Sequence, residues 1–492
     1  MKLYDLLSGI CTVTPEDIPN IEVDKISSDS RDEVSESTLF VALKGAKFDA
    51  HDAVPELSKK GVQVFVVEHD CGVEHQIVVR DSRLALSTLW ANWYHNPERK
   101  LKLIGVTGTN GKTTTTTFIK RLLDALGIKA GLIGTCGNEV CDRHIHAENT
   151  TPMPNEFFEL LSEMVDAGCE YAVMEASSQG LEQERLGKCV FEVSAFLNLT
   201  QDHLDVHGSM ENYYQAKKLL FGRSKNAVID IDDPYGERLF GEIDCPKYTL
   251  SIRKEADFYA DMIKLSAHKS TYWYSNALKS YKVEIPLPGS YNVSNTMTAI
   301  AVLELAGIGA EKTVPLISKI NGVRGRCEVV PTGRDFTVII DYAHSPDAIT
   351  NILKNVRESA GGGRRIVCLF GCGGNRDAKK RPLMAQAAEK DADFLVITSD
   401  NPRNEEPHAI IEDIIAGLSP GFKEYIEIDN RREAIFWAIK NAKKDDVIVL
   451  CGKGHEDYQI LSTGKIHFDE REVVAEALSV AFGDSSPGGE AK

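Results

Sequence analysis

The amino-acid sequence predicts an α/β protein of three domains. A central P-loop-type domain with a mostly parallel sheet is expected between an N-terminal α/β domain and a C-terminal, Rossmann-like α/β domain. The length of 492 residues corresponds to about three domains of roughly 150 residues each. Short β-branched runs alternate with helical patterns along the chain, as in α/β units around parallel sheets. One such run, at residues 103–106, enters a glycine-rich loop that a helical pattern follows.

The expected strands and breaks follow from the same patterns. Apolar runs that predict buried strands lie at residues 62–67, 103–106, 172–174, 337–340, 366–370, 394–397 and 447–450. A polar stretch with a proline at residues 95–100 and a Pro-Thr-Gly turn at residues 331–333 interrupt these patterns. We therefore expect domains at residues 1–98, 99–331 and 332–492.

The composition narrows the class of protein. Apolar residues make up 42% and charged residues 26%, which is ordinary globular usage and excludes a disordered chain. The net charge of −17 argues against a nucleic-acid-binding or polybasic membrane surface. No stretch approaches the roughly 18 consecutive apolar residues of a spanning helix, and the N-terminus lacks signal-peptide features. The eleven scattered cysteines favour reduced thiols, so we expect a cytoplasmic protein. We also expect a monomer.

The strongest motif is the loop GVTGTNGKTT at residues 105–114. Glycines there allow backbone N–H groups to surround phosphate oxygens, Lys112 adds a charge, and Thr113 offers a hydroxyl to Mg²⁺. A strict Walker sequence has glycine at the position of Val106. The residues expected to bind nucleotide phosphates are Gly108, Thr109, Asn110, Gly111, Lys112, Thr113 and Thr114.

A metal site is expected beside this loop. Glu175 ends an expected strand, and His203 lies in the segment NLTQDHLD at residues 198–205. A carboxylate and an imidazole near strand ends can hold Mg²⁺ together with Thr113. Either residue alone is more often structural, but the pair beside a phosphate loop favours a site.

The loop and four further segments resemble the Mur ligase family of ATP-dependent, amide-forming enzymes. These segments are HGSMENYYQAK at 207–217, GSYNVSN at 289–295, RGRCE at 324–328 and DYAHSPD at 341–347. The resemblance implies that Lys217 carries a metal-binding carbamate, that Asn292 and Asn295 support the adenine, and that Arg326, Asp341 and His344 contact ATP. The residues alone predict a solvated helix lysine at 217, and a helix at 296–305 capped by either asparagine.

The resemblance also implies a uridine-binding N-terminal domain and a UDP-muramoyl dipeptide site. The residues implied in the N-terminal domain are Ser28, Ser30, Ala46, Lys47 and Phe48. Those implied in the central domain are Asn149, Thr150, Thr151, Ser177, Gln183 and Arg185. Gln179 stands where many relatives carry histidine.

The stretch SDNPR at residues 399–403 predicts the amino acid that is added. In the family, D-N-P-R accompanies meso-diaminopimelate: Arg403 offers a planar fork to the distal carboxylate, and Asp400 and Asn401 hold the distal ammonium. The full implied set is Arg376, Asp400, Asn401, Pro402, Arg403, Gly452 and Glu456. Without such a ligand, Arg403 would form a surface ion pair with Glu405 or Glu406. The GCGG run at 371–374 lacks the G-x-G-x-x-G spacing of a dinucleotide site.

The function implied by the resemblance is ATP- and Mg²⁺-dependent addition of meso-diaminopimelate to UDP-N-acetylmuramoyl-L-alanyl-D-glutamate through an acyl phosphate. The expected catalytic residues are Lys112, Glu175, His203 and Lys217. Two alternatives stay open. One is a lysine-adding or folylpolyglutamate-type sister ligase, and the other is a P-loop ATPase without amide-forming activity.

Overall fold

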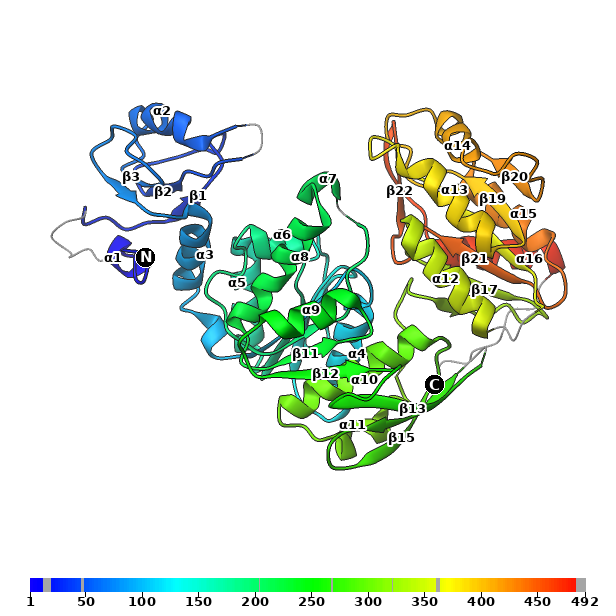
Figure 1. The fold of residues 1–492 in the computed structure, drawn as a ribbon. Coiled ribbons are helices and arrows are strands. Elements are labelled where there is room, and N and C mark those ends of the chain that lie inside the picture. The colour runs from blue at the N-terminus through cyan, green and yellow to red at the C-terminus, as the bar shows by residue number, and fades with distance from the viewer. Residues whose placement is uncertain are drawn as a thin grey trace.

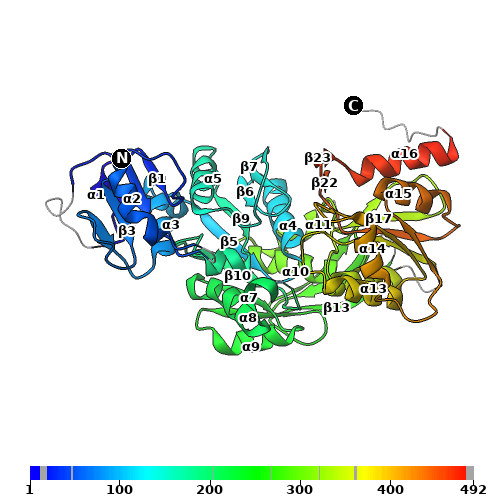
Figure 2. The ribbon, with the colours of Figure 1, turned by 90° about the horizontal axis from the view of Figure 1, so that it is seen from above.

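The computed structural model describes residues 1–11, 19–45, 48–202, 204–266, 269–320, 322–359 and 363–483. The chain forms three α/β bodies in sequence order, coloured blue, cyan to green, and yellow to red in Figure 1. The N-terminal and C-terminal bodies lie on opposite sides of the central one (Figures 1 and 2). The predicted fold class is confirmed.

The N-terminal body contains a parallel sheet of four strands in the order β1-β2-β3-β4. Its elements are α1 (Leu3–Leu6), β1 (Lys25–Ser27), β2 (Thr38–Val41), η1 (Ala50–Ala53), α2 (Val54–Lys59), β3 (Val64–Val67), β4 (Gln76–Val78) and α3 (Ser82–Trp93). Strands β2 and β3 are buried along their whole length, because helices cover both faces of the sheet. The Asp81 carboxylate caps α3 by accepting from the Leu84 N–H at 2.9 Å. The turn η2 (Pro97–Arg99) leads into the central body.

The central body contains a sheet of eleven strands in the order β15-β14-β13-β12-β11-β10-β5-β9-β6-β7-β8. The strands from β13 to β6 run parallel, and antiparallel strands extend both edges. The strands are β5 (Lys102–Thr107), β6 (Ala130–Ile133), β7 (Asn138–Val140), β8 (Arg143–Ile145), β9 (Tyr171–Glu175), β10 (Phe191–Phe196), β11 (Ala227–Asp230), β12 (Lys247–Ser251), β13 (Phe258–Leu265), β14 (Ser270–Ser275) and β15 (Ser280–Ile285).

Helices cover both faces of this sheet and create two separate apolar cores. One core contains α4 (Lys112–Ala125), α10 (Ser290–Leu305) and α11 (Ala310–Ile317). The other contains α5 (Pro154–Asp166), α6 (Ser178–Glu182), α8 (Met210–Lys218) and α9 (Pro234–Glu242), near the short α7 (Leu204–His207) and η3 (Leu219–Arg223). The parallel strands therefore end at one edge between two rigid helical layers, and the phosphate loop lies at that edge.

The C-terminal body contains a six-stranded sheet in the order β16-β17-β21-β18-β19-β20, parallel except for β16. Its strands are β16 (Glu328–Val330), β17 (Thr337–Asp341), β18 (Ile366–Phe370), β19 (Phe394–Thr398), β20 (Tyr425–Ile428) and β21 (Val447–Cys451), beside the hairpin β22 (Tyr458–Leu461) and β23 (Gly464–His467). The helices α12 (Pro346–Ser359), α13 (Lys380–Asp391) and α14 (Pro407–Ile415) cover one face, and α15 (Arg431–Lys440) and α16 (Glu470–Phe482) cover the other. Strand β16 precedes residue 331 and yet pairs with β17 in this sheet.

Every apolar run predicted as a strand contains one, and the glycine-loop helix is confirmed as α4. The expected helix start at residue 296 is wrong, because α10 begins at Ser290 after Gly289, whose φ is 94°. Asn292 and Asn295 thus lie inside the helix, and neither is its N-cap. Asn292 tolerates that position because its amide donates to the Pro288 carbonyl at 2.7 Å.

Two further findings concern the cysteines and the helices. All eleven cysteines are free thiols, and the nearest recorded pair, Cys141 and Cys169, has its sulfur atoms 3.5 Å apart. Across the ranges that the structure describes, none of the helices is both long and apolar enough to span a membrane.

Candidate active site

The glycine-rich loop between β5 and α4 lines a cavity of about 220 Å³. Gly111 holds φ at 89°, and a side chain there would meet the Asn295 Oδ1 atom at 2.5 Å, so only glycine fits. Val106 stands where a Walker sequence has glycine because this position is still part of strand β5. It is fully buried and pairs with Glu175 on one side and Ala195 on the other.

Lys112 is the first residue of α4 and lies in this cavity. Its ammonium donates to the carbonyl oxygens of Gly108 and Thr109, each at 2.9 Å. Burial lowers the pKa of Lys112, although the Glu175 carboxylate acts in the opposite direction. The lysine therefore sits folded over its own loop, where phosphate oxygens can replace the two carbonyls as acceptors. The remaining predicted loop residues that line the cavity are Thr109, Asn110, Gly111, Thr113 and Thr114.

Glu175 ends β9 and is 1% exposed. Its carboxylate accepts from the Thr113 hydroxyl at 3.0 Å and from the Thr135 N–H at 2.8 Å. Within the described residues no cationic side chain forms an ion pair with Glu175, and no cluster of three metal-ligating side chains is present. A carboxylate beside a hydroxyl offers the hard oxygen atoms that Mg²⁺ prefers. His203, the other expected metal ligand, lies outside the described residues.

Lys217 is buried in α8, so the expectation of a solvated helix lysine is wrong. It is 1% exposed, because α8 packs its polar end onto the phosphate loop. Its ammonium donates to the Gly108 carbonyl at 2.8 Å and lies 4.5 Å from the centre of the Tyr213 ring. Burial, and then the charge of Lys112, lower the pKa of Lys217 well below its ordinary value. An amine with a lowered pKa is more often neutral, which is the form that reacts with CO₂.

The C-terminal body completes the cavity with residues that the sequence predicts for ATP. The Arg326 Nη2 atom donates to the Thr113 hydroxyl at 3.2 Å, and the guanidinium lies 4.7 Å from the Tyr342 ring centre. The Arg326 Nε atom is buried without a hydrogen-bond partner. Asp341 accepts from the Cys327 N–H at 2.7 Å, so it holds the segment that carries Arg326. His344 lines the cavity, and burial lowers its pKa and keeps the imidazole neutral.

The two asparagines predicted for the adenine are buried in α10, behind the phosphate loop. The Asn295 Oδ1 atom accepts from the Thr115 hydroxyl at 3.3 Å, and Asn292 is bonded to the Pro288 carbonyl. Asn295 therefore contacts the loop from behind. Asn292 does not line the cavity beside Lys112.

The residues predicted for the UDP-muramoyl dipeptide in the central body are close together. Thr150 and Ser177 line the same cavity as Lys112. Thr151 connects the set, because its hydroxyl donates to the Glu175 carbonyl at 2.8 Å and its carbonyl accepts from Arg185 at 2.7 Å. A side-chain bond between Arg185 and Gln183, at 3.0 Å, joins the last pair, and Asn149 directly precedes Thr150.

The residues predicted in the N-terminal body lie on separate loops. Ser28 and Ser30 are half-buried in the loop after β1, and the Phe48 side chain is 55% exposed. Ala46 and Lys47 lie outside the described residues. None of the described three lines the cavity at the phosphate loop.

Three loops meet at the carboxyl ends of the neighbouring strands β21, β18 and β19, as parallel strands require. The GCGG run lies in the loop after β18 and is bonded to the D-N-P-R stretch, which explains its glycines better than a dinucleotide site does. The Gly374 N–H donates to the Asn401 carbonyl at 2.9 Å, and the Gly374 carbonyl accepts from Arg403 Nη1 at 3.0 Å. Arg403 has a φ of 54°, a left-handed conformation that costs a non-glycine residue about 1 kcal/mol.

The side chains of the D-N-P-R stretch differ in what they offer a ligand. The Asp400 Oδ1 atom is buried and accepts no hydrogen bond. Asn401 is already bonded to protein groups: its oxygen accepts from Lys453 and Ile460, and its amide donates to Glu456 at 3.1 Å. Pro402 is buried, and Arg376 is exposed on the neighbouring loop.

The alternative ion pair between Arg403 and Glu405 is wrong. Glu405 pairs instead with Arg381, at 2.8 Å between Nη2 and Oε2. Gly452, at φ 116°, approaches Asp400 so closely that a side chain there would meet the Oδ2 atom at 2.8 Å. The predicted loop residues are thus brought together, apart from Arg376, which faces solvent.

Two buried cations of these loops were not predicted. Lys453 has a side-chain exposure of 0% and bonds Asn401 and Glu456. Arg431 is also fully buried; it pairs with Glu470 and donates to the carbonyl of Ser399, just before Asp400. The only sequence signal for Lys453 is its place between glycines directly after a buried strand, and Arg431 carries none.

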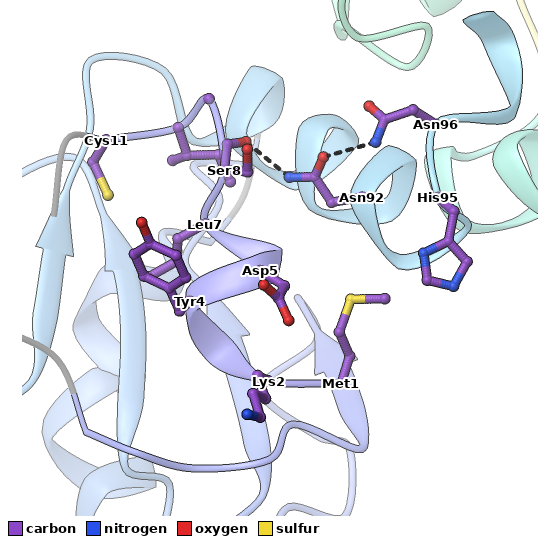
Figure 3. A pocket seen from close by; sticks show the side chains of 12 residues that line it. Met1, Lys2, Tyr4, Asp5, Leu7, Ser8, Cys11, Asn92, His95 and Asn96 are labelled. Atoms are coloured by element: carbon purple, nitrogen blue, oxygen red, sulfur yellow. Dashed lines mark hydrogen bonds between the residues drawn. The ribbon is translucent and has the colours of Figure 1, made fainter. Parts of the chain in front are cut away.

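A wider hollow of about 1090 Å³ lies at the other end of the molecule, between the N-terminal segment and the end of α3 (Figure 3). Asn92 holds its wall by donating to the carbonyl of Ser8 at 2.8 Å. None of the residues predicted for a site lines it.

Comparisons with known proteins identify relatives of this chain. Residues 106–303 match the model of the Mur ligase middle domain, and residues 325–454 match that of the Mur ligase glutamate ligase domain. A UDP-N-acetylmuramoyl-L-alanyl-D-glutamate–2,6-diaminopimelate ligase of Clostridium acetobutylicum is 44% identical over 94% of this chain and 96% of its own. A ligase of the same name from Geobacillus kaustophilus is 41% identical over 97% and 99%.

Solved structures of related ligases also match this chain. A structure of a ligase of that name matches with a TM-score of 0.67 and 32% identity, over 96% of this chain and 99% of the other. Mycobacterium tuberculosis folylpolyglutamate synthase, complexed with ADP and AMPPCP, matches with a TM-score of 0.61 but 17% identity, over 82% and 96%. That second likeness is one of fold alone.

Proposed function

This chain belongs to the Mur ligase family, and from that premise we propose that it joins meso-diaminopimelate to UDP-N-acetylmuramoyl-L-alanyl-D-glutamate with conversion of ATP to ADP and phosphate. One observation carries the proposal. The C-terminal body places Arg326 on the phosphate loop, at 3.2 Å from Thr113, and the same body presents the loop with Asp400 and Arg403. The segment that leads into the C-terminal sheet thus reaches the nucleotide cavity, and loops of the same sheet carry the residues for the amino acid.

The chemistry divides into two balanced steps. The γ-phosphoryl group passes from ATP to the side-chain carboxylate of D-glutamate, which releases ADP and forms an acyl phosphate. An amine of diaminopimelate then attacks the acyl carbon, the bond to phosphate breaks, and the amine loses a proton as the amide forms. Lys112 and Arg326 stabilise the charge on the moving phosphoryl group from two sides. Closure by the C-terminal body excludes water from the acyl phosphate.

We propose Mg²⁺ as the metal of this site. Thr113 and Glu175 fit it, because a buried carboxylate without a cationic partner faces a hydroxyl there. His203 and a carbamate on Lys217 complete the proposed set of ligands. When bound, the ion neutralises charge on the phosphates.

The division of labour along the chain follows the three bodies. We propose that residues 1–98 hold the uridine end through Ser28, Ser30 and the loop with Phe48, that residues 99–331 hold ATP and the dipeptide, and that residues 332–492 hold diaminopimelate. Strand β16 belongs structurally to the C-terminal body, since it pairs with β17. Asn292 and Asn295 are the proposed adenine neighbours.

The loops of the C-terminal body match the two charges at the far end of diaminopimelate. Arg403 uses its Nη1 atom on the carbonyls of Gly374 and Asn401, and its Nε and Nη2 atoms make no hydrogen bond within the described residues, so they remain for a carboxylate. The Asp400 Oδ1 atom, which accepts no hydrogen bond and lies 3.5 Å from the Lys453 ammonium, is the proposed acceptor for the ligand ammonium. Asn401, whose groups are all bonded, orients Glu456 for the same ligand.

Phosphate release tests this function. The purified protein is given ATP and the UDP-muramoyl dipeptide with diaminopimelate, with lysine, or with neither. We expect release that requires both the dipeptide and diaminopimelate. Release with lysine but not diaminopimelate would indicate a lysine-adding ligase, and release without either substrate would indicate a P-loop ATPase.

The proposed carbamate on Lys217 has its own test. Arginine at this position stays cationic and cannot react with CO₂, so Lys217→Arg is expected to lower turnover at least about tenfold. The adjacent Lys218, which pairs with Glu242 at the surface, supplies the matched control Lys218→Arg. With ¹³C-labelled bicarbonate, the carbamate carbon should give an NMR signal in the wild type and in Lys218→Arg, and none in Lys217→Arg. A signal that persists in Lys217→Arg would place the carbamate elsewhere.

A further inference from the structure

Lys453 is a buried lysine at the centre of the loops of the C-terminal body. Its side chain is 0% exposed, and three oxygen atoms surround its ammonium. The Nζ atom donates to the Asn401 Oδ1 atom at 3.1 Å and to the Glu456 Oε2 atom at 3.0 Å, and it lies 3.5 Å from the Asp400 Oδ1 atom. A lysine is almost never fully buried unless such partners hold it.

The bonds of Lys453 join two loops that the sheet leaves separate. Asn401 follows β19, Glu456 follows β21, and strand β18 lies between them. The Asn401 amide closes the triangle by donating to Glu456 at 3.1 Å. The Lys453 side chain is fully covered, and the contacts of its ammonium go to oxygen atoms of protein side chains. It therefore acts on the ligand through Asp400 and Glu456.

The charges in this group do not cancel. Asp400 and Glu456 are two carboxylates around one ammonium, so these three side chains carry one net negative charge; Arg403, the cation proposed for the ligand carboxylate, is counted separately. The buried pair of Arg431 and Glu470 behind the loop is neutral and leaves this balance unchanged. In surroundings of low dielectric, one uncompensated carboxylate attracts one cation, whereas two would strongly favour ligands with more positive charge.

We propose that Lys453 is a positioning residue that sets the charge of this pocket, so that the pocket accepts an amino acid whose far end carries both an ammonium and a carboxylate. The inference rests on the proposed function and extends it to selectivity. The leftover negative charge takes the ammonium, and it stays small enough for the ligand carboxylate to approach Arg403. A pocket with two uncompensated carboxylates would instead favour lysine, whose far end carries only an ammonium.

The test measures kcat/KM for diaminopimelate and for lysine by phosphate release, and the ratio of the diaminopimelate value to the lysine value is compared among variants. Lys453→Met keeps the size of the side chain and removes its charge, so the ratio should fall about tenfold or more. Lys453→Arg keeps the charge and should bring the ratio back toward the wild-type value. Glu456→Gln changes the charge in the opposite direction, so the ratio should rise even as both values drop. A purely structural role would lower both values together and leave the ratio unchanged.

The matched control is Lys120→Met. Lys120 is also buried and also pairs with two carboxylates, Asp124 at 2.6 Å and Glu139 at 3.7 Å, but it belongs to α4. Its loss should lower the midpoint of thermal unfolding and leave the ratio unchanged. A wild-type ratio in Lys453→Met overturns the proposal; where that variant does not fold, a wild-type ratio in Glu456→Gln overturns it. If wild-type protein releases no phosphate in response to diaminopimelate, the proposed function itself fails.

Discussion

Lys112→Ala is expected to reduce kcat for ATP-dependent amide formation about 10³-fold, the largest loss expected of any substitution in the chain. The ammonium of Lys112 lies among the carbonyl oxygens of its own loop, and the β- and γ-phosphates would take their place. Its charge acts on the phosphoryl group as it moves, so its loss raises the barrier more than it weakens binding. Phosphate release at saturating substrate concentrations measures the effect.

The control for this experiment is Lys129→Ala, an exposed lysine of the same body that donates to the Ala167 carbonyl. It should keep wild-type turnover. The melting temperatures of both variants should stay near that of the wild type, because Lys112 ends in a cavity and leaves no apolar core unfilled. Near-normal turnover in folded Lys112→Ala would contradict the role of the loop in phosphoryl transfer.

Arg403→Ala is expected to lower kcat/KM for diaminopimelate about 100-fold and to leave the KM for ATP close to the wild-type value. The substitution removes the planar pair of donors that Arg403 offers to the ligand carboxylate. The phosphate loop lies in another body and is not changed. Steady-state kinetics with each substrate varied in turn will separate the two effects. Arg403→Lys should fall between alanine and the wild type, since it keeps the charge but not the fork.

Arg403 also holds the Gly374 carbonyl, so a structural contribution has to be separated from binding. Arg432→Ala serves as the control, because Arg432 is an arginine of the same body that pairs with Glu476 on the surface. It should leave both KM values unchanged. Equal losses for ATP and diaminopimelate in Arg403→Ala would mean that the loop supports the whole fold and does not select the amino acid.

The fold was largely predictable because its signals are local. Residues 366–370 and 447–450 are apolar at every position, as strands covered on both faces must be, and they form β18 and β21. The start of α10 was predicted wrongly for a nonlocal reason. Residues such as Asn292 favour helix caps in isolation, and only the carbonyl of Pro288 and the loop in front of the helix satisfy them inside it.

The candidate site was predictable where chemistry requires a fixed spacing along the chain. The loop from Gly108 to Thr114 is one example, and D-N-P-R after β19 is another. Lys453 was missed because its importance comes from Asn401 and Asp400, about fifty residues away. The contacts by which Asn401 joins the two loops were missed for the same reason, because its partners Lys453 and Glu456 are also distant in the sequence.

The sequence by itself determined the fold class and the phosphate loop with Lys112, because each depends on neighbours in the chain. Its net charge of −17 argued against a nucleic-acid-binding surface and gave no information about phosphate binding, since local cations decide how a phosphate binds. Only the tertiary structure decided that Lys217 and Lys453 are buried and that Arg326 reaches Thr113 from another body. A lysine is solvated or buried according to what packs over it, and those residues come from distant parts of the chain.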